Sequence, residues 1–136
     1  MDIYEYDFVL PLGFNDEKGN LIKRGKMRPA TAYDELMVQN DDNNKVNPRY
    51  RDILILSRVV TEIEGNRDIT PQLIEELYEV DFIYLQMLYK EINSTQGRKA
   101  EVRCPSCGHL DQISMGQLYD DMGYNYEEEE ETQLPG

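Results

Sequence analysis

The stretch from Asn47 to Asn93 carries the strongest helical pattern in this 136-residue chain. Asn47 can cap a helix by accepting backbone hydrogen bonds, and Pro48 suits the first helical turn. Gly65 can adopt the left-handed backbone conformation that ends many helices. Between these signals, apolar residues form a wide stripe at helical spacing: Ile53, Leu54, Ile55, Leu56, Val59, Val60 and Ile63. We therefore expect one helix from Asn47 to Gly65 at the centre of the hydrophobic core.

A second helical segment repeats these signals. Thr70 can act as an N-cap, and Pro71 follows it at the first turn. Asp81 can act as a new N-cap, because an apolar helical pattern follows it as far as Ile92. We expect a short helix, a break at 79–81 and then a longer helix.

The N-terminal region has the alternating pattern of strands. Alternating apolar residues predict a strand from 3 to 10 that ends at Pro11-Leu12-Gly13. The polar segment 15–20 predicts a tight turn, after which 21–27 can return as a second strand. We therefore expect a β-hairpin.

A further helix is expected after this hairpin. Thr31 can cap it, and Asp34 can complete a variant capping box by bonding back to the cap. The polar segment 39–45 buries too little apolar surface to order itself, which predicts a mobile loop before the central helix.

The charge and hydropathy of the chain argue against two classes of partner. With 27 acidic and 14 basic residues the formal net charge is -13, which repels nucleic-acid phosphates. The sequence has no apolar run of about eighteen residues, the length that spans a membrane. Its first residues lack the basic and apolar segments of a signal peptide. We expect a cytoplasmic protein that binds neither nucleic acid nor membrane.

The sharpest local motif is Cys104-Pro105-Ser106-Cys107-Gly108-His109. Two cysteines at this spacing can hold one zinc ion from a tight turn that a glycine helps to close. A structural zinc site has four ligands, and the chain offers only Cys104, Cys107 and the adjacent His109. Four interpretations stay open. The turn can be a degenerate knuckle without metal, or a zinc site whose missing ligands come from His109, from a second protomer or from a partner. It can also be an inert thiol pair or a redox motif.

No catalytic constellation is evident around these residues. His109 is the single histidine, and no serine or cysteine nucleophile with a positioned base surrounds it. Several helical carboxylates are interpreted as a solvated face: Glu62, Glu64, Glu75, Glu76, Glu79 and Asp81. In the helix that ends at Ile92, Tyr84 and Met87 fall outside the main apolar stripe, and we interpret them as candidate partner-binding residues.

These observations predict an α+β protein in four parts. Residues 1–93 form a domain in which an N-terminal β-hairpin packs on a small helical bundle, and 94–99 form a linker. Residues 100–123 form a zinc-ribbon-like half-knuckle with one short strand into the cysteine turn and one out of it. Residues 124–136 form a disordered acidic tail, because the five consecutive glutamates Glu127–Glu131 repel one another.

The order of several segments resembles a known family. The segments are Phe8-Val9-Leu10-Pro11-Leu12-Gly13, Asp16-Glu17-Lys18-Gly19-Asn20, Gly25-x-Met27-Arg28-x-Ala30-Thr31-Ala32 with Asp34-Glu35, Asn47-Pro48-x-Tyr50 with Ser57-Arg58-Val59-Val60, Ile69-Thr70-Pro71, Leu85-x-x-Leu88-Tyr89-x-x-Ile92-Asn93 and Cys104-Pro105-x-Cys107-Gly108-His109. This order, over roughly residues 4 to 115, is similar to the T-even-type baseplate hub assembly chaperones of contractile phage tails and bacterial contractile injection systems.

The resemblance implies a non-enzymatic assembly chaperone whose partners are baseplate hub, tail tube or spike proteins. It would act in the cytoplasm of a bacterium or a phage-infected host cell. One alternative is a structural baseplate plug or adaptor that stays in the assembled particle. Another, from a different class, is a small zinc-dependent or thiol enzyme. The cysteine motif adds two further expectations, a structural zinc ion with an incomplete ligand set in one chain and a homo-oligomer formed through the knuckle.

Overall fold

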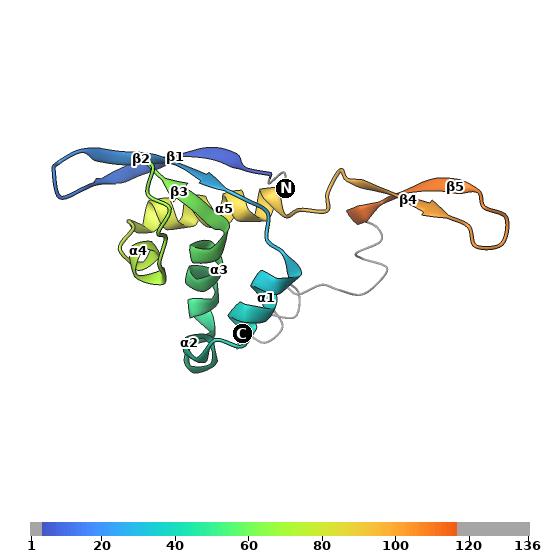
Figure 1. The fold of residues 1–136 in the computed structure, drawn as a ribbon, viewed down its shortest axis with the longest axis horizontal. Helices are drawn as coiled ribbons and strands as arrows, with labels where there is room; N and C mark the ends of the chain where they lie inside the picture. Colours follow the sequence, from blue (N-terminus) through green and yellow to red (C-terminus); the bar gives the residue numbers. More distant parts are fainter. Residues whose placement is uncertain (1–3, 117–136) are drawn as a thin grey trace, which may run out of the picture. The chain divides into compact units, whose positions relative to one another are not determined.

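The computed structural model describes residues 4–116 and has a mixed α+β fold (Figure 1). The chain divides into two compact units, one ending at Asn93 and the other beginning at Ser94. The first contains a three-stranded antiparallel sheet with helices, and the second a two-stranded antiparallel sheet. The α+β class is thus confirmed. The predicted acidic tail at 124–136 and the end of the predicted knuckle, 117–123, lie outside the described residues.

The predicted N-terminal hairpin is present. Strand β1 (Tyr6–Asn15) pairs antiparallel with β2 (Leu21–Met27), and the Asp16 side chain closes the turn by accepting hydrogen bonds from backbone N–H groups. The expectation that 11–13 ends the first strand is wrong. Gly13 adopts a left-handed backbone (φ 74°) inside an irregular part of the pairing, and the strand continues beyond it.

A third strand replaces the end of the predicted central helix. The segment begins with the 3-10 turn η1 (Pro48–Tyr50), continues as α3 (Arg51–Val59) and then becomes strand β3 (Val60–Ile63). The prediction of one helix to Gly65 is therefore wrong. The β-branched residues at the end of the segment suit a strand, and β3 gains backbone hydrogen bonds by pairing with β2. Gly65 does adopt a left-handed backbone (φ 84°), but in the turn after β3.

The remaining helices of the first unit are α1 (Ala32–Gln39), α2 (Asp42–Val46), α4 (Pro71–Glu75) and α5 (Glu79–Ile92). The caps predicted at Thr31 and Thr70 are confirmed, because Thr31 and Asp34 form a capping box and Thr70 accepts a hydrogen bond from the Leu73 N–H group.

Two expectations about the helices are wrong. The segment 39–45 is not a loop throughout, since Asp41 caps the short helix α2. The break between α4 and α5 lies before Glu79 rather than at 79–81. Asp81 is therefore inside α5, where it is buried instead of acting as a cap or belonging to a solvated face.

The core lies between the sheet and the helices. Figure 1 shows α3 and α5 on one side of the three strands, and α5 packs on β1 while α3 packs on α4 and α1. The buried apolar residues are Phe8, Leu10, Met27, Val38, Leu54, Ile55, Leu56, Val59, Val60, Ile63, Ile74, Leu77, Leu85 and Ile92. The prediction that the segment around 53–60 occupies the centre of the core is confirmed. No helix among residues 4–116 has the length and apolar character needed to cross a membrane.

The second unit is a single hairpin over its described part. Strand β4 (Lys99–Arg103) pairs antiparallel with β5 (Leu110–Ser114), so the strands expected on both sides of the cysteine turn are present. Every side chain in these two strands is exposed or half-buried. The hairpin thus has no buried apolar core of its own within the described residues.

Candidate functional site

The turn Cys104–His109, here called the cysteine turn, joins β4 to β5. The Cys104 N–H group donates to the His109 carbonyl at 2.8 Å, and the Gly108 N–H group donates to the Cys104 carbonyl at 2.8 Å. Gly108 has a left-handed backbone (φ 73°), which costs a glycine less than other residues. These bonds fold the chain back on itself, so that both cysteines lie in one tight turn.

The two thiols interact with each other in this turn. Backbone N–H groups of Cys107 and Ser106, together with the Cys107 side chain, hydrogen-bond to the Cys104 sulfur and lower the pKa of that thiol. Cys104 is half-buried, Cys107 is exposed, and both are free thiols. A lowered pKa increases the fraction of thiolate, which is the form that binds metals.

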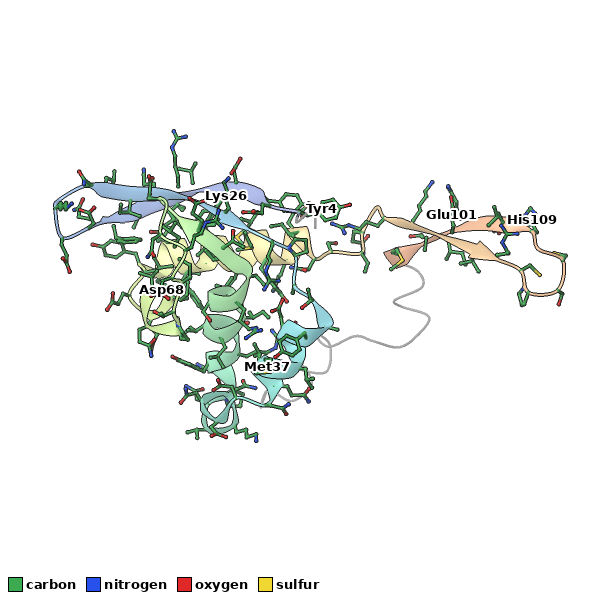
Figure 2. The ribbon with its side chains drawn as sticks, viewed as in Figure 1. Tyr4, Lys26, Met37, Asp68, Glu101 and His109 are labelled. Carbon is green, nitrogen blue, oxygen red and sulfur yellow. The ribbon has the colours of Figure 1, made fainter. Side chains whose placement is uncertain are left out.

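The third predicted ligand does not complete a metal site. His109 is exposed and contributes its backbone carbonyl to the turn (Figure 2). Over residues 4–116, no group of three or more His, Cys, Asp or Glu side chains is arranged to hold a metal ion. The structure thus brings Cys104 and Cys107 together and leaves His109 apart, which amounts to half of the four-ligand set of a structural zinc site.

The solvent-facing side of α5 carries an apolar stripe, which we call the α5 stripe and define as Val80, Ile83 and Met87. These side chains are 51%, 46% and 66% exposed. Their spacing of three and four residues places them on one face of the helix. Leu85 and Ile92 face the core from the opposite side.

The two predicted partner-binding residues occupy different environments. Met87 lies in the α5 stripe, whereas Tyr84 is half-buried and packs edge-to-face against Phe8 with ring centroids 6.4 Å apart. Val80 and Ile83 were not identified from the sequence. Their spacing relative to Met87 could have revealed both. Val80 was missed because the helix was expected to begin after Asp81, whereas Ile83 lay within the expected helix and was not singled out.

Exposed acidic residues outnumber basic ones along α4, α5 and the segment between them. The exposed carboxylates of α4, α5 and the segment between them are Glu75, Glu76, Glu79 and Glu91. Helix α5 contains one basic residue, Lys90. These two helices and their connection therefore carry more negative than positive exposed side chains, in keeping with the net charge of -13.

One buried carboxylate of the first unit forms structural ion pairs. Asp34 accepts hydrogen bonds from Arg28 at 2.7 and 3.0 Å and from Arg58 at 2.9 Å. Burial opposes ionisation of this carboxyl, but the two guanidinium groups and the Thr31 N–H group outweigh it and hold its pKa well below the usual range. This cluster ties α1 to α3 and to the end of β2, and it exposes no carboxylate for catalysis.

Two shallow depressions also occur in the first unit. One of about 400 Å³ lies over the sheet, and one of about 470 Å³ lies between α1, α3 and the segment before α4. Neither is lined by a cysteine or a histidine. Ser57 lines the second, but its hydroxyl donates to the Leu54 carbonyl at 2.7 Å rather than to a base.

Comparisons of the chain with protein-family models, with curated proteins and with solved structures found no match. The resemblance read from the sequence therefore stays a prediction, and the functional argument depends on the two sites described above.

Proposed function

We propose that the protein is a non-enzymatic assembly chaperone that binds a baseplate hub or tail tube protein of a contractile phage tail or contractile injection system. The observation that carries the binding part of this proposal is the α5 stripe. The order of sequence segments supports the choice of client. On this proposal the protein acts in the cytoplasm of the bacterium or infected cell, before the particle is complete.

The α5 stripe has the pattern of a helix that docks into a groove. Apolar anchors at positions i, i+3 and i+7 are typical of helices recognised in this way. Full burial of one such side chain contributes about 1.5–3 kcal/mol, so Val80, Ile83 and Met87 together can support specific binding. Single exposed apolar residues are common on protein surfaces, but three on one helical face form a candidate contact surface.

The charge around the stripe defines the chemistry of the client surface. Glu79 and Glu91 lie at the two ends of α5, and Glu75 and Glu76 precede it. A client with an apolar groove flanked by lysine or arginine residues would match both the stripe and its acidic surroundings. Such a rim would also accelerate association, and high salt should slow it.

The binding surface is tested with a purified hub or tube protein and two variants of this chain. We expect the double substitution Ile83→Asp and Met87→Asp to weaken binding at least tenfold, because each charge would enter an apolar contact. Val46→Asp, which alters a more exposed apolar residue on α2, serves as the control. Equal affinity of the double variant and the control would rule out the α5 stripe as the contact surface.

The fate of the protein separates a chaperone from a structural plug or adaptor, which would use the same stripe. Mass spectrometry of purified sheathed particles, beside capture of the protein with hub or tube subunits before assembly, makes this distinction. A chaperone should be captured with its client and be missing from finished particles. Stoichiometric recovery in the particles would assign the protein to the plug or adaptor class.

A further inference from the structure

The β4–β5 hairpin poses a problem of stability. Of its apolar residues, Ala100 and Ile113 are only half-buried, and Val102 and Leu110 are 40% and 51% exposed. A two-stranded hairpin without a packed face is at best marginally stable in water. Small units of this kind are usually held by a disulfide, a metal ion or another chain. Figure 1 shows the loop that joins β4 to β5, and the two free cysteines belong to this part of the chain.

The backbone of the cysteine turn is already arranged for a metal. Two thiolates separated by two residues can both reach one zinc ion from a tight turn. The cysteine turn joins Cys104 and Cys107 in this way. The bonds from Cys104 to His109 and from Gly108 to Cys104 hold the loop in this shape before any metal arrives. Little ordering would therefore be needed on binding.

Charge near the turn also favours a thiolate site. Arg103 lies at the end of β4, and its guanidinium group donates to the Gly108 carbonyl at 3.4 Å. Four thiolates around one Zn²⁺ carry a net charge of about -2, which a neighbouring guanidinium partly offsets. Each thiol would release its proton to solvent on binding, and no change of oxidation state is involved.

We propose that two copies of this chain share one zinc ion through Cys104 and Cys107 of each copy. One chain supplies two thiols that lie together and no third ligand among its described residues, whereas a structural zinc site needs four. A second identical cysteine turn supplies the missing pair, and a two-fold axis through the metal makes the site closed and symmetric. The binding free energy of the metal would then also stabilise the two hairpins.

The shared site goes beyond the proposed client binding and is independent of it, because the α5 stripe takes no part. The full chain, purified under reducing conditions with zinc present, is examined by native mass spectrometry and metal analysis. We expect a dimer that holds one zinc per two chains. Removal of the metal by a chelator should give monomers, and returning zinc should restore the dimer.

Variants identify the ligands. Cys104→Ser and Cys107→Ser should each lose both the zinc and the dimer, whereas His109→Ala should keep both. Circular dichroism checks that the helical first unit stays folded, which its separate core predicts. A monomer that holds its own zinc and loses it with His109→Ala would overturn the proposal in favour of a site closed within one chain. A wild-type chain that binds no zinc would overturn it as well.

Discussion

Gly13 in β1 and Asp81 in α5 are joined by a buried hydrogen bond, in which the Gly13 N–H group donates to the Asp81 carboxylate at 2.9 Å. The adjacent Leu12 N–H group donates to the other carboxylate oxygen at 2.8 Å. Two successive N–H groups thus donate to one carboxylate, next to the left-handed backbone of Gly13 (φ 74°). The Asp81 side chain thus satisfies the donors that the irregular pairing of β1 leaves open, and it anchors the strand on α5.

Removal of the Asp81 carboxylate should destabilise the first unit. In Asp81→Ala the buried Gly13 N–H group and the partly buried Leu12 N–H group lose their acceptor, which should lower the free energy of unfolding by about 2–3 kcal/mol. Asp81→Asn keeps one acceptor oxygen and should lose less. Urea denaturation measures both changes.

Asp68→Ala, which removes an exposed carboxylate, is the control and should stay within about 0.5 kcal/mol of the wild type. If Asp81→Ala lost no more stability than Asp68→Ala, the Asp81 carboxylate would not anchor β1 on α5.

Local signals explain which parts of the fold the sequence predicts. The caps at Thr31 and Thr70 were predicted because their hydrogen bonds reach only three residues along the chain. Strand β3 was missed because its stabilising partner is β2, more than thirty residues earlier, and the apolar residues of 60–63 fit a helix as well as a strand. The role of Asp81 was missed for the same reason, since its donors lie 68 and 69 residues away.

In the candidate sites, too, the residues that were predicted depend on local signals. Cys104 and Cys107 were identified from their spacing, because one tight turn brings them together. Met87 was identified from the helical periodicity. Val80 was missed because the helix was expected to begin after Asp81, whereas Ile83 lay within the expected helix and was not singled out. Asp81 lies inside α5 and hydrogen-bonds to β1, a tertiary contact that no local pattern contains.

The ion pairs of Asp34 should make stability depend on pH in the acid range. The folded-state pKa of this carboxyl lies below its ordinary value of 3.8, so its contribution is fully present above that pH and is lost as the pH falls below it. Asp34→Asn should destabilise the protein by about 1.5–3 kcal/mol near neutral pH, since it leaves the half-buried guanidinium groups of Arg28 and Arg58 without a counter-charge.

Urea denaturation of the wild type and of Asp34→Asn, on both sides of pH 3.8, tests this sign. The difference between the two proteins should shrink as the pH falls, because protonation removes the same charge that the substitution removes. A difference that stays constant with pH would mean that Asp34 acts through packing alone.

Tyr89 should make the stability of the fold decrease as the pH rises in the alkaline range, whereas Asp34 makes it decrease as the pH falls in the acid range. Its hydroxyl donates to Glu35 at 3.0 Å, and burial together with the Glu35 charge raises its pKa to about 12 from an ordinary 10.0. Between these values the unfolded chain releases the proton and the folded chain keeps it, so stability falls as the pH rises. Tyr89→Phe should lose about 1 kcal/mol at neutral pH and show a shallower decline above pH 10 in urea denaturation. An unchanged alkaline slope would argue against this assignment.

Gly25 in β2 should tolerate no side chain, because the sheet and the core approach it closely. A Cβ atom at this position would lie 2.4 Å from the Phe8 ring and 2.6 Å from the Glu62 carbonyl oxygen, which belongs to the backbone of β3. Gly25→Ala should therefore push β3 or Phe8 aside and cost about 1–3 kcal/mol or more, with a matching fall in the melting temperature.

Gly19→Ala is the matched control, since a Cβ there meets no atom within 4 Å and only its left-handed backbone (φ 81°) opposes the change. That substitution should cost about 1 kcal/mol, and Gly19→Asn less, because asparagine accepts this conformation more readily. A Gly25→Ala variant as stable as Gly19→Asn would show that the sheet can shift at this point, and that β3 is held less tightly than its pairing with β2 implies.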